Sequence, residues 1–232
     1  MSDFFTLCTG YWQILLFISV ISYLIGGISF SIIATNIFCG KTDIRSLGSG
    51  NAGFTNVLRT SGKIPAIVTF AGDFLKGVFC VWLGKSIAAL QPEIAENNNL
   101  LQYVAYIAGF MCVLGHIYPC FFGFKGGKGI LTGWSVTLLI DWRVFIIIIC
   151  VFLVVLAFTR IVSLSSICAA SSYPIVTFIL TYIDYRKYGG DIHYTAVCTV
   201  ISLLTAAIVV IKHKSNISRL ISGEEKQITA KN

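Results

Sequence analysis

The sequence predicts an all-α, polytopic integral membrane protein with seven transmembrane helices. Of its 232 residues, 56% are hydrophobic and only 12% are charged, and the mean hydropathy is +0.83. A water-soluble domain cannot bury that much apolar surface. Apolar runs of about 20 residues, long enough to cross roughly 30 Å of hydrocarbon, also recur along the chain. We therefore expect a single membrane-embedded domain over residues 1–232.

Seven apolar stretches define the expected spans. The first is too long for the core of a signal peptide and no Lys or Arg precedes it, so we expect it to be retained. The fourth and fifth are short and are also compatible with one bent helix, which would leave six crossings. In chain order the expected spans are 12–38, 64–89, 101–123, 129–141, 143–159, 162–183 and 194–211.

The distribution of Lys and Arg favours seven crossings, because cytoplasmic loops carry an excess of basic residues. Six crossings would place the basic carboxyl-terminal tail opposite the first basic loop. Seven crossings leave few bases on one side: Lys85, Arg143, Arg186 and Lys187. Apart from Lys76, which lies within a span, they gather the rest on the opposite side: Lys41, Arg45, Arg59, Lys63, Lys125, Lys128, Arg160, Lys212, Lys214, Arg219, Lys226 and Lys231. We therefore expect the amino terminus outside and the carboxyl terminus in the cytoplasm.

Cysteine spacing and net charge narrow the possible partners. The eight cysteines are scattered, mostly in apolar runs, and none has the spacing of a zinc site, so we interpret them as small buried residues. A net charge of +7 also occurs in nucleic-acid-binding proteins, but in a membrane protein it reflects orientation and contact with anionic headgroups. We expect membrane lipid as a partner, and no nucleic acid, metal or cofactor.

Four polar segments fall on the expected cytoplasmic side. The placement of the spans does not depend on glycines, serines or histidines, so the convergence of these segments is partly independent evidence for one site at the cytoplasmic interface. The segments are 43–63, 115–129, 159–166 and 212–225.

The first segment has the composition of a phosphate-binding loop. Its glycines let backbone N–H groups turn toward an anion, and Arg59 offers a guanidinium with paired N–H donors. The run GSGNAG also fits the dinucleotide pattern GxGxxG, but no predicted strand precedes it. The short polar side chains that offer hydrogen bonds are Ser49, Asn51, Thr55 and Asn56.

The second segment, GFKGGKG, sets Lys125 and Lys128 among glycines just before an apolar helix, where an anion is favoured. The alternative is that both lysines are interfacial anchors. In the third segment, Ser165 and Ser166 either donate to a ligand or satisfy their own helix. In the fourth, His213 is a candidate general base, phosphate donor or interfacial side chain.

Two further polar features receive structural interpretations. Asp73 and Lys76, three residues apart within a span, are expected to form an ion pair, because isolated charges there are costly. His116, which precedes Tyr118 and Pro119, is expected to orient the end of a helix.

Taken together, these motifs resemble the bacterial PlsY family, the acyl-phosphate:glycerol-3-phosphate acyltransferases. The resemblance spans nearly the whole chain in order. Departures are mild: Ala52, Ser61 and the acidic run GEE that ends at residue 225. The matching segments are GSGNAGFTNVLR (48–59), DFLKG (73–77), GHIYPCFFGFKGGKG (115–129), TRIVSLSS (159–166) and the pattern of His213, Asn216, Arg219, Leu220 and Gly223.

The resemblance implies a seven-helix enzyme of the bacterial inner membrane with its active site on the cytoplasmic side. Such an enzyme moves a fatty acyl group from acyl phosphate to the 1-hydroxyl of sn-glycerol 3-phosphate, releasing phosphate and lysophosphatidic acid. The family uses neither acyl-CoA nor acyl carrier protein directly and needs no metal. A soluble enzyme that forms acyl phosphate is a further expected partner.

The resemblance also implies roles for individual residues. Lys125 and Lys128 would neutralise a phosphoryl group or the developing oxyanion, and either His213 or an oxygen of acyl phosphate would take the proton of the attacking hydroxyl. Phosphate would be held by Ser49, Thr55, Asn56 and Arg59. Glycerol 3-phosphate would be held by Ser165, Ser166, His213 and Asn216.

Two other functions fit parts of the sequence. A transporter for a phosphate ester would bind the same anion, but transporters often carry internal repeats and midplane sites, and the polar residues here lie at one face without a repeat. A non-catalytic partner in a lipid-synthesis complex would not need the full set of motifs.

Overall fold

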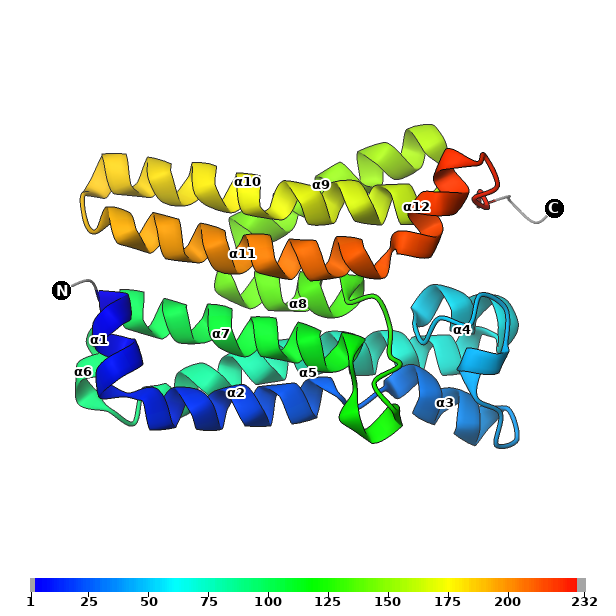
Figure 1. Cartoon of the computed structure of the whole chain (residues 1–232), viewed down its shortest axis with the longest axis horizontal. Coiled ribbons are helices and arrows are strands. Elements are labelled where there is room, and N and C mark those ends of the chain that lie inside the picture. Colours follow the sequence, from blue (N-terminus) through cyan, green and yellow to red (C-terminus); the bar gives the residue numbers. More distant parts are fainter. Residues whose placement is uncertain (1–2, 229–232) are drawn as a thin grey trace.

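The computed structural model describes residues 3–228, and within this range the chain is helical and contains no β-strand (Figure 1). The eight longer helices are α2 (Trp12–Gly26), α3 (Phe30–Phe38), α5 (Lys63–Ala88), α7 (Asn98–Ile117), α8 (Ile130–Ile140), α9 (Trp142–Thr159), α10 (Val162–Tyr188) and α11 (Ile192–Lys212). The short ones are α1 (Asp3–Gly10), η1 (Ile44–Ser46), α4 (Phe54–Thr60), α6 (Pro92–Ala95), η2 (Cys120–Phe122) and α12 (Lys214–Ile221).

The long apolar helices confirm an all-α, multi-pass membrane protein. Within residues 3–228, six segments are long and apolar enough to cross a bilayer, and α8 is a shorter apolar helix. Large apolar side chains cover the outside of the bundle; Phe158 on α9, for example, is 87% exposed. Such a surface suits contact with lipid chains, not water.

The first expected span, 12–38, is two helices instead of one. Between α2 and α3 the chain leaves helical geometry, and Ser29 is extended. Close packing of Gly26 against the backbone of Cys112 accompanies this break. The freed carbonyl of Ile28 accepts a hydrogen bond of 2.8 Å from the Lys76 ammonium, which satisfies it inside the bundle.

The stretch 129–159 is also two helices, so the single bent helix considered above is wrong for this region. Asp141 is extended and caps α9 by accepting a hydrogen bond from the backbone N–H of Arg143. Helix α8 runs back from the end of α7, and α9 returns in the opposite direction (Figure 1). Because α8 has only 11 residues, about 16 Å long, the number of full crossings stays a prediction.

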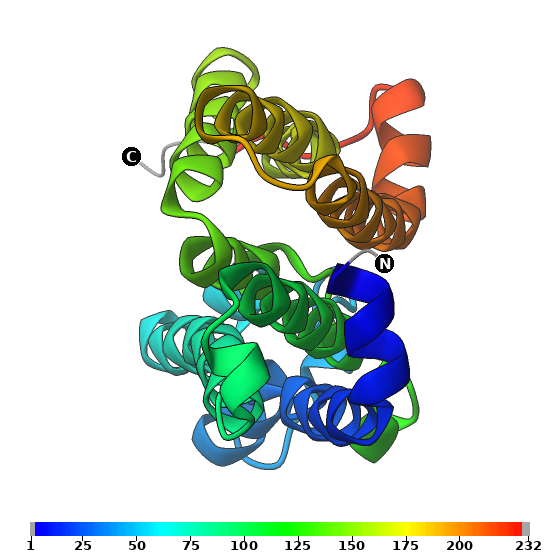
Figure 2. The ribbon, with the colours of Figure 1, turned by 90° about the vertical axis from the view of Figure 1, so that its left-hand side faces the viewer.

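The helices pack in two groups with α8 between them. Helices α2, α5 and α7 contact one another, α9 and α11 both contact α10, and α8 contacts α5, α7 and α9 (Figure 2). Near one end of this bundle lie α4, the loop that follows α7, and α12, whereas α1, α6 and the α10–α11 turn lie at the other end (Figure 1).

Candidate active site

A cleft of about 880 Å³ opens at the end of the bundle that carries α4 and α12. Its lining, as residues 3–228 define it, includes basic side chains from several separated segments and no acidic side chain, so its charge suits an anionic ligand. The lining residues are Arg45, Ser49, Gly50, Asn51, Phe121, Phe122, Gly123, Lys125, Gly126, Lys128, Lys212, Ser215 and Arg219.

Asn56 organises the first loop. Its side chain is buried, its Oδ1 accepts from the backbone N–H of Ser49 at 3.0 Å, and its Nδ2 donates to the carbonyl oxygens of Leu47 at 2.9 Å and Asn51 at 3.1 Å. Gly48 has a positive φ of 57°, and a Cβ there would collide with Asn56 Oδ1. Asn56 therefore shapes the loop from inside and presents Ser49 and Asn51 to the cleft.

The glycines of the second loop serve close backbone packing. The N–H groups of Gly126 and Gly127 donate to the carbonyl oxygens of Ile117 at 3.2 Å and His116 at 3.1 Å. A Cβ on Gly127 would collide with the His116 ring and the carbonyl oxygen of Ala52. These two N–H groups thus point into the protein, and the anion-attracting groups of this loop are its lysines.

A buried polar cluster packs against the inner side of the second loop. Lys76 Nζ lies 2.8 Å from Asp73 Oδ1, which confirms the expected ion pair, and donates to His116 Nδ1 at 3.0 Å. The His116 ring in turn packs against Gly127. His116 therefore has a structural position between the Asp73–Lys76 pair and the loop, and its expected role in orienting the helix end stays a prediction.

Lys128 begins a chain of hydrogen bonds beside the cleft. Its ammonium donates to Asn216 Oδ1, and Asn216 Nδ2 donates to Glu225 Oε1 at 2.6 Å. Glu225 also accepts from Ser163 Oγ at 2.7 Å and from Arg219 Nε at 2.6 Å. Burial lowers the pKa of Lys128 to about 8. Burial opposes ionisation of Glu225, but the hydrogen bonds from Ser163, Asn216 and Arg219 outweigh it and lower its pKa.

His213 is buried next to this network, at the end of α11. The residue is only 2% exposed, and its Nδ1–H donates to the carbonyl oxygen of Val209 at 2.7 Å. Burial lowers the pKa of His213 to about 4, so the imidazole is neutral at pH 7 with its lone pair on Nε2.

Some expected site residues lie elsewhere. Thr55 and Arg59 are exposed on α4 and do not line the cleft. The hydroxyls of Ser165 and Ser166 are buried and donate to carbonyl oxygens one turn earlier, those of Ile161 and Val162. The structure does not bring these four side chains to the cleft, and their contact with substrate stays a prediction.

Sequence reasoning also missed residues that the structure brings to the site. The sequence identifies Arg45 and Lys212 only as basic loop residues, yet both line the cleft. Arg45 is held there by Asp43 and by its donation to the Phe122 carbonyl oxygen at 2.6 Å. In the sequence Glu225 stands only as a departure in the tail, although its place after the donors Asn216 and Arg219 in the same segment is a possible signal.

A family model described as "Glycerol-3-phosphate acyltransferase" matches residues 16–223, which include every lining residue of the cleft. The chain belongs to the glycerol-3-phosphate acyltransferase family. The match covers all four polar segments, apart from the last two residues of the fourth, and confirms the family resemblance.

Glycerol-3-phosphate acyltransferases of several bacteria are similar along nearly their whole length. The protein of Syntrophomonas wolfei is 41% identical over 212 residues, covering 91% of this chain and 96% of the relative. That of Clostridioides difficile is 37% identical over 214 residues, covering 92% and 95%. Both carry the name glycerol-3-phosphate acyltransferase.

Two crystal structures of PlsY (YgiH), an integral membrane glycerol 3-phosphate acyltransferase, share the fold. The glycerol 3-phosphate form superposes with a TM-score of 0.75 at 32% identity, covering 93% of this chain and 96% of PlsY. The lysophosphatidic acid form has a TM-score of 0.73 at 31% identity, with coverages of 93% and 95%. The helical arrangement of this glycerol-3-phosphate acyltransferase family is thus that of an integral membrane enzyme.

Proposed function

We propose that this chain transfers a fatty acyl group from acyl phosphate to the 1-hydroxyl of sn-glycerol 3-phosphate, forming lysophosphatidic acid and inorganic phosphate. The observation that carries the proposal is the basic cleft at one end of an apolar helical bundle. A cleft at the membrane interface is accessible both to a dianionic, water-soluble acceptor and to a donor whose long acyl chain lies in the bilayer. Family membership supports the acceptor and product, and the sequence motifs support acyl phosphate as donor.

The cleft offers two sets of phosphate-binding groups. Ser49, Asn51 and Arg45 lie on the first loop, and Lys125, Lys128 and Arg219 come from the second loop and α12. We assign one phosphoryl group to each set, with Asn56 acting through the shape of the first loop. Thr55 and Arg59 remain predicted phosphate contacts, and Ser165 and Ser166 remain predicted contacts of glycerol 3-phosphate.

The chemistry needs alignment and charge stabilisation more than a strong protein nucleophile. The 1-hydroxyl oxygen attacks the acyl carbon of the mixed anhydride, the carbon–oxygen bond to phosphate breaks, and the hydroxyl proton leaves with the phosphate. Lys128 and Lys125 stabilise the negative charge that develops on the acyl and phosphoryl oxygens. No metal or cofactor is needed for these steps.

A phosphoryl oxygen of the donor is the base in this proposal. His213 is neutral, but its pKa of about 4 makes it a weak base, and its Nδ1–H is engaged by Val209. Its Nε2, and the Asn216 amide nearby in the chain, position glycerol 3-phosphate.

His213→Asn tests this assignment. An amide keeps a donor for the Val209 carbonyl but cannot serve as a base. We expect a higher KM for glycerol 3-phosphate and a kcat within about tenfold of wild type, measured across pH 5–9 at saturating substrate. A kcat loss of about 10²–10⁴-fold would instead identify His213 as the general base.

We further propose the membrane arrangement. One domain spans residues 1–232 and crosses a bacterial inner membrane seven times, with α8 as the short crossing, the amino terminus outside and the carboxyl terminus in the cytoplasm. The cleft then faces the cytoplasm, where a soluble enzyme that forms acyl phosphate can deliver the donor to the basic loops.

The activity itself is tested with purified protein in detergent micelles, palmitoyl phosphate and labelled glycerol 3-phosphate. We expect labelled lysolipid and stoichiometric release of phosphate. Because micelles enclose no compartment, a transporter or a non-catalytic partner would form no labelled lysolipid, and that result would reject the proposal.

A further inference from the structure

A second polar cavity, of about 620 Å³, lies at the opposite end of the bundle from the active-site cleft. It is formed between the beginnings of α7, α9 and α11 and the end of α10. Its rim is exposed at Asn98, Tyr188 and Gly190, so a ligand can enter from water or from the membrane interface. The acyl transfer proposed above assigns no role to any residue of this cavity.

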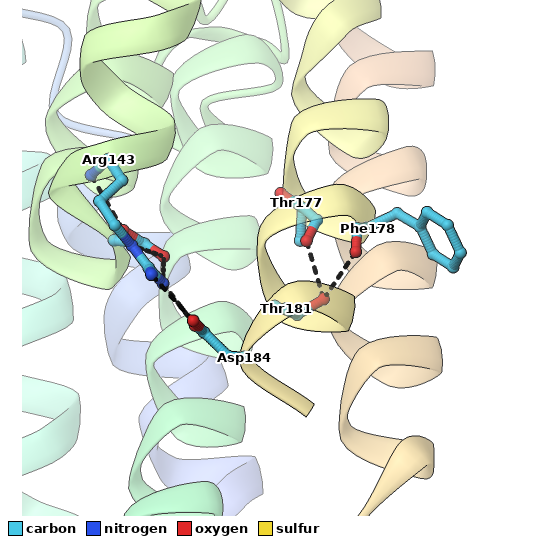
Figure 3. A network of polar contacts seen from close by, with 6 residues as sticks. Arg143, Thr177, Phe178, Thr181 and Asp184 are labelled. Carbon is cyan, nitrogen blue, oxygen red and sulfur yellow. Dashed lines mark hydrogen bonds and ion pairs between the residues drawn. The ribbon is translucent and has the colours of Figure 1, made fainter. Parts of the chain in front are cut away.

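A triad of charged side chains stiffens one wall of this cavity. The Arg143 guanidinium lies between two carboxylates, 2.7 Å from Asp141 Oδ2 and 2.6 Å from Asp184 Oδ2, and so joins α9 to α10. Figure 3 shows the contact of Arg143 with Asp184 and, on the same helix α10, Thr181 donating to the Thr177 carbonyl oxygen at 2.8 Å. One guanidinium facing two carboxylates leaves this wall with net negative charge.

The opposite wall carries a carboxylate with no cationic partner among residues 3–228. Asp191 lines the cavity and accepts the backbone N–H of His193 at 2.9 Å, which caps α11. No ion pair joins it to a basic side chain in that range. The carboxylate retains free lone pairs toward the cavity.

Two buried oxygen atoms in the lining also lack partners. Thr195, one helical turn after Asp191, is only 1% exposed, and its Oγ1 makes no hydrogen bond within residues 3–228. Gln102 Oε1 on α7 is likewise buried and without a donor in that range. Buried polar atoms in native proteins nearly always have partners, so these two oxygens require hydrogen bonds from something else in the cavity.

Aromatic rings complete the lining. Tyr106, Tyr185, Tyr188 and Tyr194 all face the cavity. At its rim, the Lys187 ammonium lies 4.9 Å from the centre of the Tyr188 ring in a cation–π contact. The carboxylates do not form a cluster suited to a metal ion within residues 3–228.

These features select a primary ammonium group. Negative walls and tyrosine faces attract a cation, and Gln102 Oε1 can only accept hydrogen bonds, so a cation with N–H donors fits the cavity. A primary ammonium carries three such donors, one for each of Asp191, Thr195 and Gln102. We propose that this cavity binds a ligand with a primary ammonium group, held by Asp191, Thr195 and Gln102. The group belongs either to a free small amine or to the headgroup of an aminophospholipid; the recognition chemistry is the same.

Ethanolamine binding tests the proposal on the full-length protein in detergent micelles. Equilibrium dialysis with labelled ethanolamine is expected to show saturable binding. Ethylene glycol, which lacks the charge, and tetramethylammonium, which lacks N–H groups, are expected to compete at least tenfold more weakly. The proposal would be overturned if ethanolamine showed no saturable binding in either micelles or the bilayers described below. It would also be overturned if ethylene glycol or tetramethylammonium competed as strongly as ethanolamine.

Two variants localise the binding. Asp191→Asn keeps a side-chain cap for α11 but removes the charge, and Gln102→Leu removes the acceptor. We expect each to weaken ethanolamine binding about tenfold or more, because each deletes a hydrogen bond to a charged group. Glu96→Gln, an exposed acid at the same end that does not line the cavity, is the matched control and should bind as wild type. Glycerol 3-phosphate acylation should be unchanged in all three, which verifies folding; equal weakening in the control would reject the site.

Bilayers distinguish the source of the ammonium. In nanodiscs of phosphatidylcholine, free ethanolamine should bind as in micelles. If discs of phosphatidylethanolamine reduce that binding, and Asp191→Asn removes the difference, the occupant is the lipid headgroup. Equal binding in both lipids assigns the cavity to a free amine.

Discussion

At the scale of single residues, Glu225 determines how α12 meets α10. Its carboxylate accepts from Ser163 on α10 and from Asn216 and Arg219 on α12, and its side chain is 10% exposed. Hydrogen bonds to a buried charge are stronger than neutral ones because the surroundings screen them weakly. The residue thereby fixes the Asn216 amide that Lys128 contacts.

Glu225→Gln should therefore loosen the site. The amide keeps one acceptor but loses the charge, and we expect destabilisation of about 1.5–3 kcal/mol together with a higher KM for glycerol 3-phosphate. Thermal unfolding in detergent and steady-state kinetics measure both effects. Ser163→Ala, which removes a single donor, is the control and should cost about 1 kcal/mol. Wild-type stability in Glu225→Gln would show that the network does not bear on folding.

Lys128 should make substrate capture sensitive to alkaline pH. Its pKa of about 8 means that the ammonium carries its charge below pH 8 and loses it as the pH rises above that value. The kcat/KM for glycerol 3-phosphate should consequently fall above pH 8. Lys128→Arg, which stays protonated, should abolish this fall, whereas Lys125→Arg should retain it. If kcat/KM of Lys128→Arg still fell above pH 8, the fall would belong to another group.

At the scale of elements, the two glycine-rich loops support each other through backbone contact. Gly127 packs against Ala52 in the first loop and against His116 in α7, and His116 rests on the Asp73–Lys76 pair. Close backbone approach is available only to glycine, so the loops hold their lysines and polar side chains on a rigid base.

Gly127→Ala should disrupt this support. The added Cβ meets the Ala52 carbonyl and the His116 ring, and we expect a loss of about 1–3 kcal/mol in stability and a larger fractional loss of activity. Gly133→Ala in α8 is the matched control, because a Cβ there meets nothing within 4 Å and alanine favours a helix. Equal thermal midpoints for the two variants would contradict the packing role of Gly127.

At the scale of the whole molecule, the ends of the bundle differ in chemistry. The active-site end presents a basic cleft, and the opposite end presents a cavity lined by Asp141, Asp184 and Asp191 around a single arginine. This asymmetry matches the rule that basic loops stay in the cytoplasm and supports the proposed orientation.

Thiol labelling tests that orientation. We expect a membrane-impermeant maleimide to label Glu96→Cys in intact cells, and to label Ser46→Cys and Ser222→Cys only after permeabilisation. All three positions are exposed in the structure; Ser46 follows the cleft residue Arg45, and Ser222 is the C-cap of α12. Labelling of Ser46→Cys and Ser222→Cys from opposite sides of the membrane would contradict the shared active-site rim.

Much of the fold was predictable from sequence because membrane insertion imposes a simple local rule. A span must be long, apolar and helical, so 64–89 and 143–159 were found within one or two residues of α5 and α9. The break in 12–38 escaped prediction, because it depends on the packing of Gly26 against α7 and on the reach of Lys76 from α5.

The amino-acid sequence by itself determined the membrane class and the family, and it identified the three segments that line the cleft, 43–63, 115–129 and 212–225, since these follow from local composition and motif order. Only the tertiary structure decided which side chains face the cleft. In the folded chain, Arg45 and Lys212 line the cleft, and Asn56 is buried inside the first loop. Glu225 lies between α10 and α12 and accepts a hydrogen bond from Ser163. The physical reason is that hydrogen bonds and burial between distant residues depend on how the helices pack, and no local pattern records that packing.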